Sequence, residues 1–192
     1  MVVTGNSTPA VSDCLFLSNG ARSGGGAVST GSNAAPTFSG CTFADNRITS
    51  NGSGGAIQLG IGSPTFTDCL FAGNGTGAST GGAIYVDIGA NPTILRSTFS
   101  GNFASSTGGA IKVMGTGNAT ASDSVFAGNR SSGSSGGAAA VSGSASLTVS
   151  GCTFAGNVAR YDGAGVYSDT GGTLKITNCT FSGNREIGRA HV

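Results

Sequence analysis

Apolar residues return along this chain at a nearly constant interval, and the most regular of them belong to the sequence Phe-x-x-Asn. This motif occurs seven times, with successive phenylalanines 27 or 28 residues apart. A fixed period of about 20 to 50 residues is the sequence signature of a stacked repeat architecture. We therefore expect equivalent residues of successive repeats to form ladders. The phenylalanine ladder comprises Phe16, Phe43, Phe71, Phe99, Phe126, Phe154 and Phe181, and the asparagine ladder comprises Asn19, Asn46, Asn74, Asn102, Asn129, Asn157 and Asn184.

The residues before each phenylalanine predict two short strands joined by a corner. Two positions before Phe the residue is small, and five positions before Phe it is apolar. Because successive side chains of a strand point to opposite faces, one continuous strand cannot place both positions inside. The residue just before the small one is Gly, Asn or Asp in all repeats but one, and these types tolerate left-handed backbone. The predicted corners are Asp13, Gly40, Asp68, Arg96, Asp123, Gly151 and Asn178, with Arg96 as the exception.

A third strand is predicted after the sequence Gly-Gly-Ala, which stands between successive Phe-x-x-Asn motifs. Five copies keep this sequence, and a sixth reads Gly163-Ala164-Gly165. The residues that follow alternate between apolar and variable positions, which is the period of a half-buried strand. The variable positions are expected on the outer face: Ser29, Gln58, Tyr85, Lys112, Ala140 and Tyr167.

Three short strands in each repeat predict an all-β fold, the right-handed parallel β-helix or solenoid, with about 6–7 coils of 27–28 residues. Each coil would stack on the previous one at about 4.8 Å, and parallel strands are normally joined by right-handed crossovers. A leucine-rich repeat has a comparable period, but its Leu-x-x-Leu-x-Leu frame is missing from this leucine-poor sequence. One domain is predicted over residues 1–185, with repeats from about 11 to 184.

Residues 186–192 break the repeat, because a loop and another Gly-Gly-Ala would be expected after Asn184. This segment resembles the translation of a sequencing adapter read in frame from a truncated gene. We expect a non-native tail and assign no role to His191, the single histidine. No signal peptide is visible at the start of the sequence, so we expect an internal piece of a longer protein, with more coils beyond both ends.

The composition argues against several classes of partner. Charged residues make up 9% of the chain, and the formal net charge is +1. No basic patch therefore predicts nucleic-acid binding. No apolar run approaches the roughly 20 residues that cross a bilayer, so no membrane span is expected. The recurrence of Phe, Ile, Val and Cys at a fixed period distinguishes the chain from a disordered Gly- and Ser-rich sequence.

The pairing of Gly81-Gly82-Ala83-Ile84 with Phe99 and Asn102, repeated over residues 11–184, resembles the repeat of the chlamydial polymorphic outer-membrane proteins and similar bacterial surface β-helices. Those families carry many such repeats in a secreted passenger region. The resemblance implies an extracellular, cell-surface or outer-membrane location and a role in adhesion or surface display. A host surface or a carbohydrate is the implied partner.

Right-handed β-helices also include pectate lyases and polygalacturonases, whose sites need clustered carboxylates, often with Ca²⁺ or a basic residue. Glycoside hydrolysis needs two carboxylates, and a lyase needs a base near the acidic carbon of its substrate. Here the acids are dispersed over the repeats, and three of them occupy predicted corners. We therefore expect no catalytic residue, no metal site and no cofactor. The acids before the tail are Asp13, Asp45, Asp68, Asp87, Asp123, Asp162 and Asp169.

The small column two residues before Phe holds all five cysteines: Cys14, Cys41, Cys69, Cys152 and Cys179. The odd number argues against complete pairing, and in-register side chains on stacked strands do not favour the disulfide torsion. The lack of Cys-x-x-Cys and of a usable histidine argues against zinc. We expect small inward side chains, since Ser97 and Ser124 fill the same position in other repeats.

Three functions are compatible with these patterns. The sequence favours a non-catalytic part of a bacterial secreted or surface β-helix protein, used for adhesion or display. The alternative is the scaffold part of a polysaccharide-degrading enzyme, similar to pectate lyases, whose active site lies on other coils. A third is a structural spacer without a ligand of its own. Exposed end coils also predict end-to-end association of the isolated chain.

Overall fold

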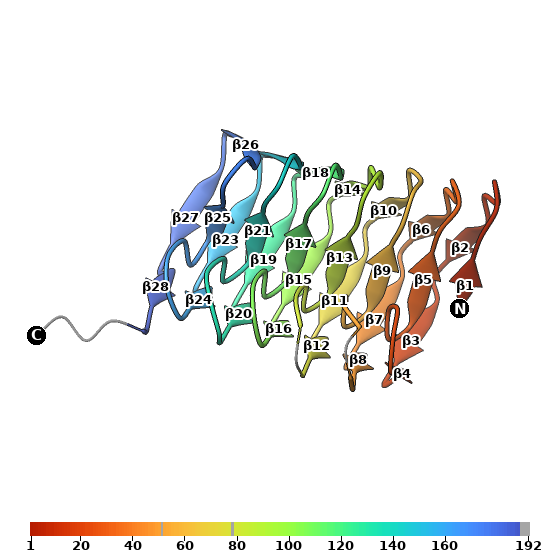
Figure 1. Ribbon diagram of the computed structural model, residues 1–192, viewed down its shortest axis with the longest axis horizontal. Coiled ribbons are helices and arrows are strands. Elements are labelled where there is room, and N and C mark those ends of the chain that lie inside the picture. The colour runs from red at the N-terminus through yellow and green to blue at the C-terminus, as the bar shows by residue number, and fades with distance from the viewer. Residues whose placement is uncertain (51, 78, 189–192) are drawn as a thin grey trace, which may run out of the picture.

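The computed structural model describes residues 1–50, 52–77 and 79–188. These residues wind into a rod of stacked coils, with β1 (Val2–Val3) at one end and β28 (Arg185–Glu186) at the other (Figure 1). The chain passes through four strand positions in each coil, and the strands make four parallel sheets of seven strands each. We call the sheets A, B, C and D in the order of passage. The predicted all-β parallel β-helix is confirmed.

The strand bounds repeat from coil to coil. Sheet A contains β1 (Val2–Val3), β5 (Val28–Thr30), β9 (Ile57–Leu59), β13 (Ile84–Val86), β17 (Ile111–Val113), β21 (Ala139–Val141) and β25 (Val166–Ser168). Sheet B contains β2 (Ala10–Ser12), β6 (Thr37–Ser39), β10 (Thr65–Thr67), β14 (Thr93–Leu95), β18 (Asn118–Ser122), β22 (Ser146–Ser150) and β26 (Thr173–Thr177). Sheet C contains β3 (Leu15–Leu17), β7 (Thr42–Ala44), β11 (Leu70–Ala72), β15 (Thr98–Ser100), β19 (Val125–Ala127), β23 (Thr153–Ala155) and β27 (Thr180–Ser182). Sheet D contains β4 (Gly20–Ala21), β8 (Arg47–Ile48), β12 (Gly75–Thr76), β16 (Phe103–Ala104), β20 (Arg130–Ser131), β24 (Val158–Ala159) and β28 (Arg185–Glu186).

Inward side chains of sheets A, B and C fill the hollow of the coil. The middle residue of each sheet C strand is the phenylalanine of the repeat, and its ring stacks on the equivalent ring one coil away. The Phe99 ring lies 4.6 Å from that of Phe71 and 4.8 Å from that of Phe126, nearly parallel to both. In sheet B, Phe38 and Phe66 stack in the same way at 5.2 Å. In-register pairing of like residues therefore builds one continuous apolar core.

A left-handed corner joins sheets B and C in every coil. All seven predicted corner residues have positive φ, from 44° at Arg96 to 62° at Gly151. At Arg96, Nε and Nη2 donate hydrogen bonds of 2.9 and 3.0 Å to the two carboxylate oxygens of Asp68, one coil earlier. The corner least suited to left-handed backbone is thus held by an ion pair to its neighbour.

The two glycines of Gly-Gly-Ala have different tasks, as Gly81 and Gly82 show. Gly81 has a φ of +67°, a conformation that L side chains rarely adopt. A Cβ on Gly82 would collide with the backbone of Gly109 and of Phe103. The second glycine therefore permits the close approach by which sheet A meets sheet D and closes the coil.

Each coil has four strands, so the prediction of three was wrong. The additional strand, in sheet D, follows the ladder asparagine in a segment that we expected to be a loop. It has only two residues, too few to show an alternating pattern. Glu186, assigned by sequence to the tail, is the second residue of β28 and pairs in register with Ala159. Of the expected tail, residues 189–192, including His191, lie outside the described residues.

Candidate functional site

The asparagine ladder makes the turn between sheets C and D. Asn102 Nδ2 donates hydrogen bonds of 2.9 Å to the Phe71 carbonyl oxygen and to Asn129 Oδ1. The backbone N–H of Asn102 donates to the same Oδ1 at 3.0 Å. The five central asparagines are fully buried. Each amide joins three coils, so these side chains belong to the framework of the turn and have no capacity left for a ligand.

The five cysteines are free thiols, and Cys41, Cys69 and Cys152 lie buried. Burial raises the pKa of the Cys69 thiol to about 11, so this thiol is protonated at neutral pH. Its Sγ lies 3.4 Å from the Thr67 carbonyl oxygen, to which it donates. Cys14, in the same column, is exposed because it adjoins β3 at the edge of sheet C.

Four of the aspartates occupy left-handed turn positions. Asp13, Asp68 and Asp123 are left-handed corners, as predicted, and Asp45 has a φ of 53° in a second left-handed column. This column, directly before the ladder asparagine, was not identified from the sequence although glycine dominates it: Ser18, Asp45, Gly73, Gly101, Gly128, Gly156 and Gly183. Within residues 1–50, 52–77 and 79–188, no group of three or more His, Cys, Asp or Glu side chains could hold a metal ion.

The outer face of sheet A departs from expectation. Tyr85 and Lys112, expected on this outer face, are only 9% and 6% exposed, and Ala140 is fully buried. Each long side chain leans over the sheet to the turn of the next coil. Tyr85 Oη donates to Met114 Sδ at 2.6 Å, and Lys112 Nζ donates to Ser142 Oγ at 2.8 Å.

Burial has electrostatic consequences on this face. It lowers the pKa of the Lys112 amine, against a smaller opposing effect of Asp169. It also raises the pKa of the Tyr85 hydroxyl to about 12, assisted by Asp87. Both groups are therefore perturbed, but both are covered and hydrogen-bonded, so a large ligand has no direct access to them.

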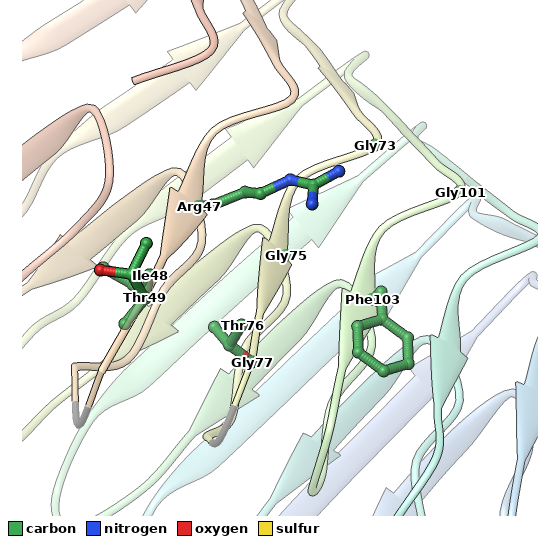
Figure 2. Close-up of a pocket in the computed structure, with 9 residues that line it drawn as sticks. All are labelled: Arg47, Ile48, Thr49, Gly73, Gly75, Thr76, Gly77, Gly101 and Phe103. Atoms are coloured by element: carbon green, nitrogen blue, oxygen red, sulfur yellow. The ribbon is translucent and has the colours of Figure 1, made fainter. Parts of the chain in front are cut away.

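An open groove of about 570 Å³ lies on the outer face of sheet D. Arg47 on β8 and Phe103 on β16 form its walls, and Gly75 on β12 lies between them in register with both. Figure 2 shows the Arg47 side chain extending from β8 towards the glycines of the next coil, with the Phe103 ring beyond β12. We call this the β12 groove.

The groove was missed in the sequence because sheet D was taken for a loop. Its outward column reads Gly20, Arg47, Gly75, Phe103, Arg130, Val158 and Arg185, which has no repeat-wide pattern. The sequence does contain one indication of the groove: at the same position of three successive repeats stand a cation, a glycine and an aromatic residue. It becomes visible only when the asparagine ladder is used to align the residue that follows.

No helix in the described ranges is long and apolar enough to cross a membrane. A family model described as a right handed beta helix region matches residues 1–181 of the chain. The match agrees with the hand expected for the crossovers. Searches among curated proteins and among solved structures find no match.

Proposed function

The chain belongs to the right-handed β-helix family, and from this premise we propose that it is a non-catalytic part of a bacterial secreted or surface protein. Its task is adhesion or display outside the cell, as the resemblance of its repeat to chlamydial polymorphic outer-membrane proteins implies. The stacked coils act as a stiff rod that carries binding surfaces on its outer faces.

The observation that carries this proposal is that six of the seven aspartates hold turn positions, Asp162 being the exception. Asp68 holds a left-handed corner and shares its carboxylate with Arg96. Asp87 Oδ1 accepts from the Ile88 N–H at 2.8 Å, and Asp169 Oδ1 accepts from the Thr170 N–H at 2.7 Å. Carboxylates used in this way maintain turns, whereas hydrolysis of a glycoside needs two of them facing one bond.

The second candidate is the scaffold of a polysaccharide-degrading enzyme, and Lys112 is the observation in its favour. A lyase uses a base whose pKa lies closer to neutrality, and burial moves the Lys112 amine in that direction. Its hydrogen bond to Ser142 and its low exposure favour a packing role. We therefore rank this candidate second.

Long-read sequencing of the gene that encodes this chain separates the two candidates. A surface protein predicts further Gly-Gly-Ala and Phe-x-x-Asn coils, followed by a surface anchor or sorting signal. A coil with Asp, Lys and Arg clustered on one face would overturn the proposal in favour of the enzyme.

A further inference from the structure

We propose that the β12 groove binds a carboxylated sugar unit, with the carboxylate on Arg47 and the sugar ring against Phe103. The inference rests on the proposed function, since it gives the surface scaffold a class of ligand. It concerns sheet D alone and needs no catalytic group.

Backbone geometry does not require glycine at Gly75 and Gly77, which form the floor of the groove. Gly75 does not have the positive φ that favours glycine, and an added Cβ would meet only the Phe103 carbonyl oxygen at 3.5 Å and two Phe103 side-chain atoms at 3.9 Å. At Gly77 the nearest atom would be the Ile48 carbonyl oxygen, at 3.7 Å. These are ordinary contacts, so the fold would accept side chains at both positions. Because both positions lack a side chain, a channel runs along β12, and the strands on its two sides, β8 and β16, lie about 9.6 Å apart.

Arg47 supplies the charge that selects the ligand. Its side chain is exposed, and the one salt bridge in the described ranges joins Arg96 and Asp68, not Arg47. A guanidinium presents a planar fork that matches a carboxylate in a bidentate arrangement. Asp45 lies near the groove's edge, since its Oδ1 would lie 2.7 Å from a Cβ placed on Gly73. Arg47 is the single charged residue that lines the groove, which suits a ligand with one carboxylate at this point.

Phe103 supplies the apolar wall. It is 37% exposed, although most phenylalanines of the chain are buried in the core. Its side chain flanks the vacant Gly75 position. A flat ring beside a cation and a glycine floor fits a thin ligand with one apolar face and one carboxylate, which describes an acidic sugar.

The test is an NMR titration of the folded chain, followed at the backbone amides of Gly73, Gly75 and Gly77. The probes are an oligomer of glucuronic acid and the glucose oligomer of equal length and linkage. We expect saturable shifts of the groove amides with the acidic oligomer and much weaker shifts with the neutral one. A second pair of probes, sialyllactose and lactose, distinguishes a terminal acidic sugar from an acidic unit within a polymer. Binding of the glucuronic acid oligomer or of sialyllactose at the groove supports the proposal.

Matched variants assign the binding to the groove. Arg47→Ala is expected to weaken the affinity about tenfold or more, and Phe103→Ala about fivefold. Arg47→Lys keeps the charge but loses the fork, so an intermediate affinity is expected. Gly75→Val fills the floor and should abolish binding. Gly31→Val, where an added Cβ would meet nothing within 4 Å, and Arg22→Ala make the same changes outside the groove and should leave binding unchanged.

Equal binding of the acidic and neutral oligomers would overturn the proposal. The same conclusion follows if Arg47→Ala and Gly75→Val are folded and bind as the unchanged protein does, or if no acidic probe shifts the groove amides. These results concern the groove alone. The proposed surface role fails on a different observation, the discovery of a catalytic coil encoded by the same gene.

Discussion

Asn74 Oδ1 accepts two hydrogen bonds from Asn46, one of 3.0 Å from its backbone N–H and one of 2.9 Å from its side-chain Nδ2. One oxygen atom thereby satisfies two buried donors of the preceding coil. Asn74 Nδ2 also donates to the Phe43 carbonyl oxygen at 2.8 Å. The turn between sheets C and D thus depends on an amide at this position in successive coils.

Replacement of Asn74 by alanine is expected to lower the free energy of unfolding by about 3 kcal/mol or more, because several buried donors and acceptors lose their partner. Urea denaturation measures this change. Asn118→Ala is the control, since its exposed side chain donates to Asn91 Oδ1 at the surface, and it should change stability by less than about 0.5 kcal/mol. Equal effects of the two substitutions would contradict the role assigned to the ladder.

The phenylalanine stack gives a second prediction. Phe99→Ala should destabilise the fold by about 3–5 kcal/mol, because it leaves a cavity between Phe71 and Phe126. Phe103→Ala removes an outward ring of the same type and should cost less than about 1 kcal/mol. Denaturation of both variants under the same conditions compares them. A small loss for Phe99→Ala would mean that the core is not closely packed.

The ion pair at the corners predicts a dependence on pH. The hydrogen bonds from Arg96 hold the pKa of the Asp68 carboxyl below its usual value. Because the folded pKa is lower than the unfolded one, the pair stabilises the fold above a pH of about 4, and this contribution is lost as pH falls through the lowered pKa. The stability difference between the unchanged protein and Arg96→Ala should therefore shrink at low pH.

The contribution of this pair is small, because both side chains are exposed. NMR titration of the Asp68 carboxyl gives the sharper readout, and its pKa should rise in Arg96→Ala. Arg96→Gly serves as a second comparison, since it removes the pair but also relieves the left-handed strain. A pKa for Asp68 that is the same with and without Arg96 would contradict the pairing.

Thiol reactivity supplies a fourth prediction. Burial raises the pKa of Cys69 to about 11 and raises that of Cys152, so both should resist alkylation at pH 8 while the protein is folded. The exposed Cys14 should react first. Mass spectrometry of alkylated peptides with and without urea measures the order. Rapid labelling of Cys69 in the folded protein would contradict its inward position.

The repeat made most of the fold predictable, because each inward column recurs seven times and errors at single positions average out. The left-handed corner could be predicted even at Arg96, since its neighbours in the column are Gly, Asn and Asp. Sheet D could not be predicted, because its strands have two residues each and such a short strand shows no alternation of apolar and polar positions. The burial of Tyr85 and Lys112 could not be predicted either, since it depends on side chains that reach Met114 and Ser142 in the next coil.

The candidate site was harder to predict than the fold for a related reason. The ladders depend on what the repeats share, whereas the β12 groove depends on where they differ. Arg47, Gly75 and Phe103 are unlike one another, and only the in-register pairing of β8, β12 and β16 brings them together. A search for conserved spacing within the chain therefore passes over them.

The most direct test of the central claim is an assay of the protein for binding and for cleavage on the same polysaccharides. Retained polymer measures binding, and newly formed reducing or unsaturated ends measure cleavage. A surface-binding scaffold predicts retention of acidic polymers without new chain ends. Release of cleaved products at an enzymatic rate would contradict the account and make this chain the scaffold of an enzyme.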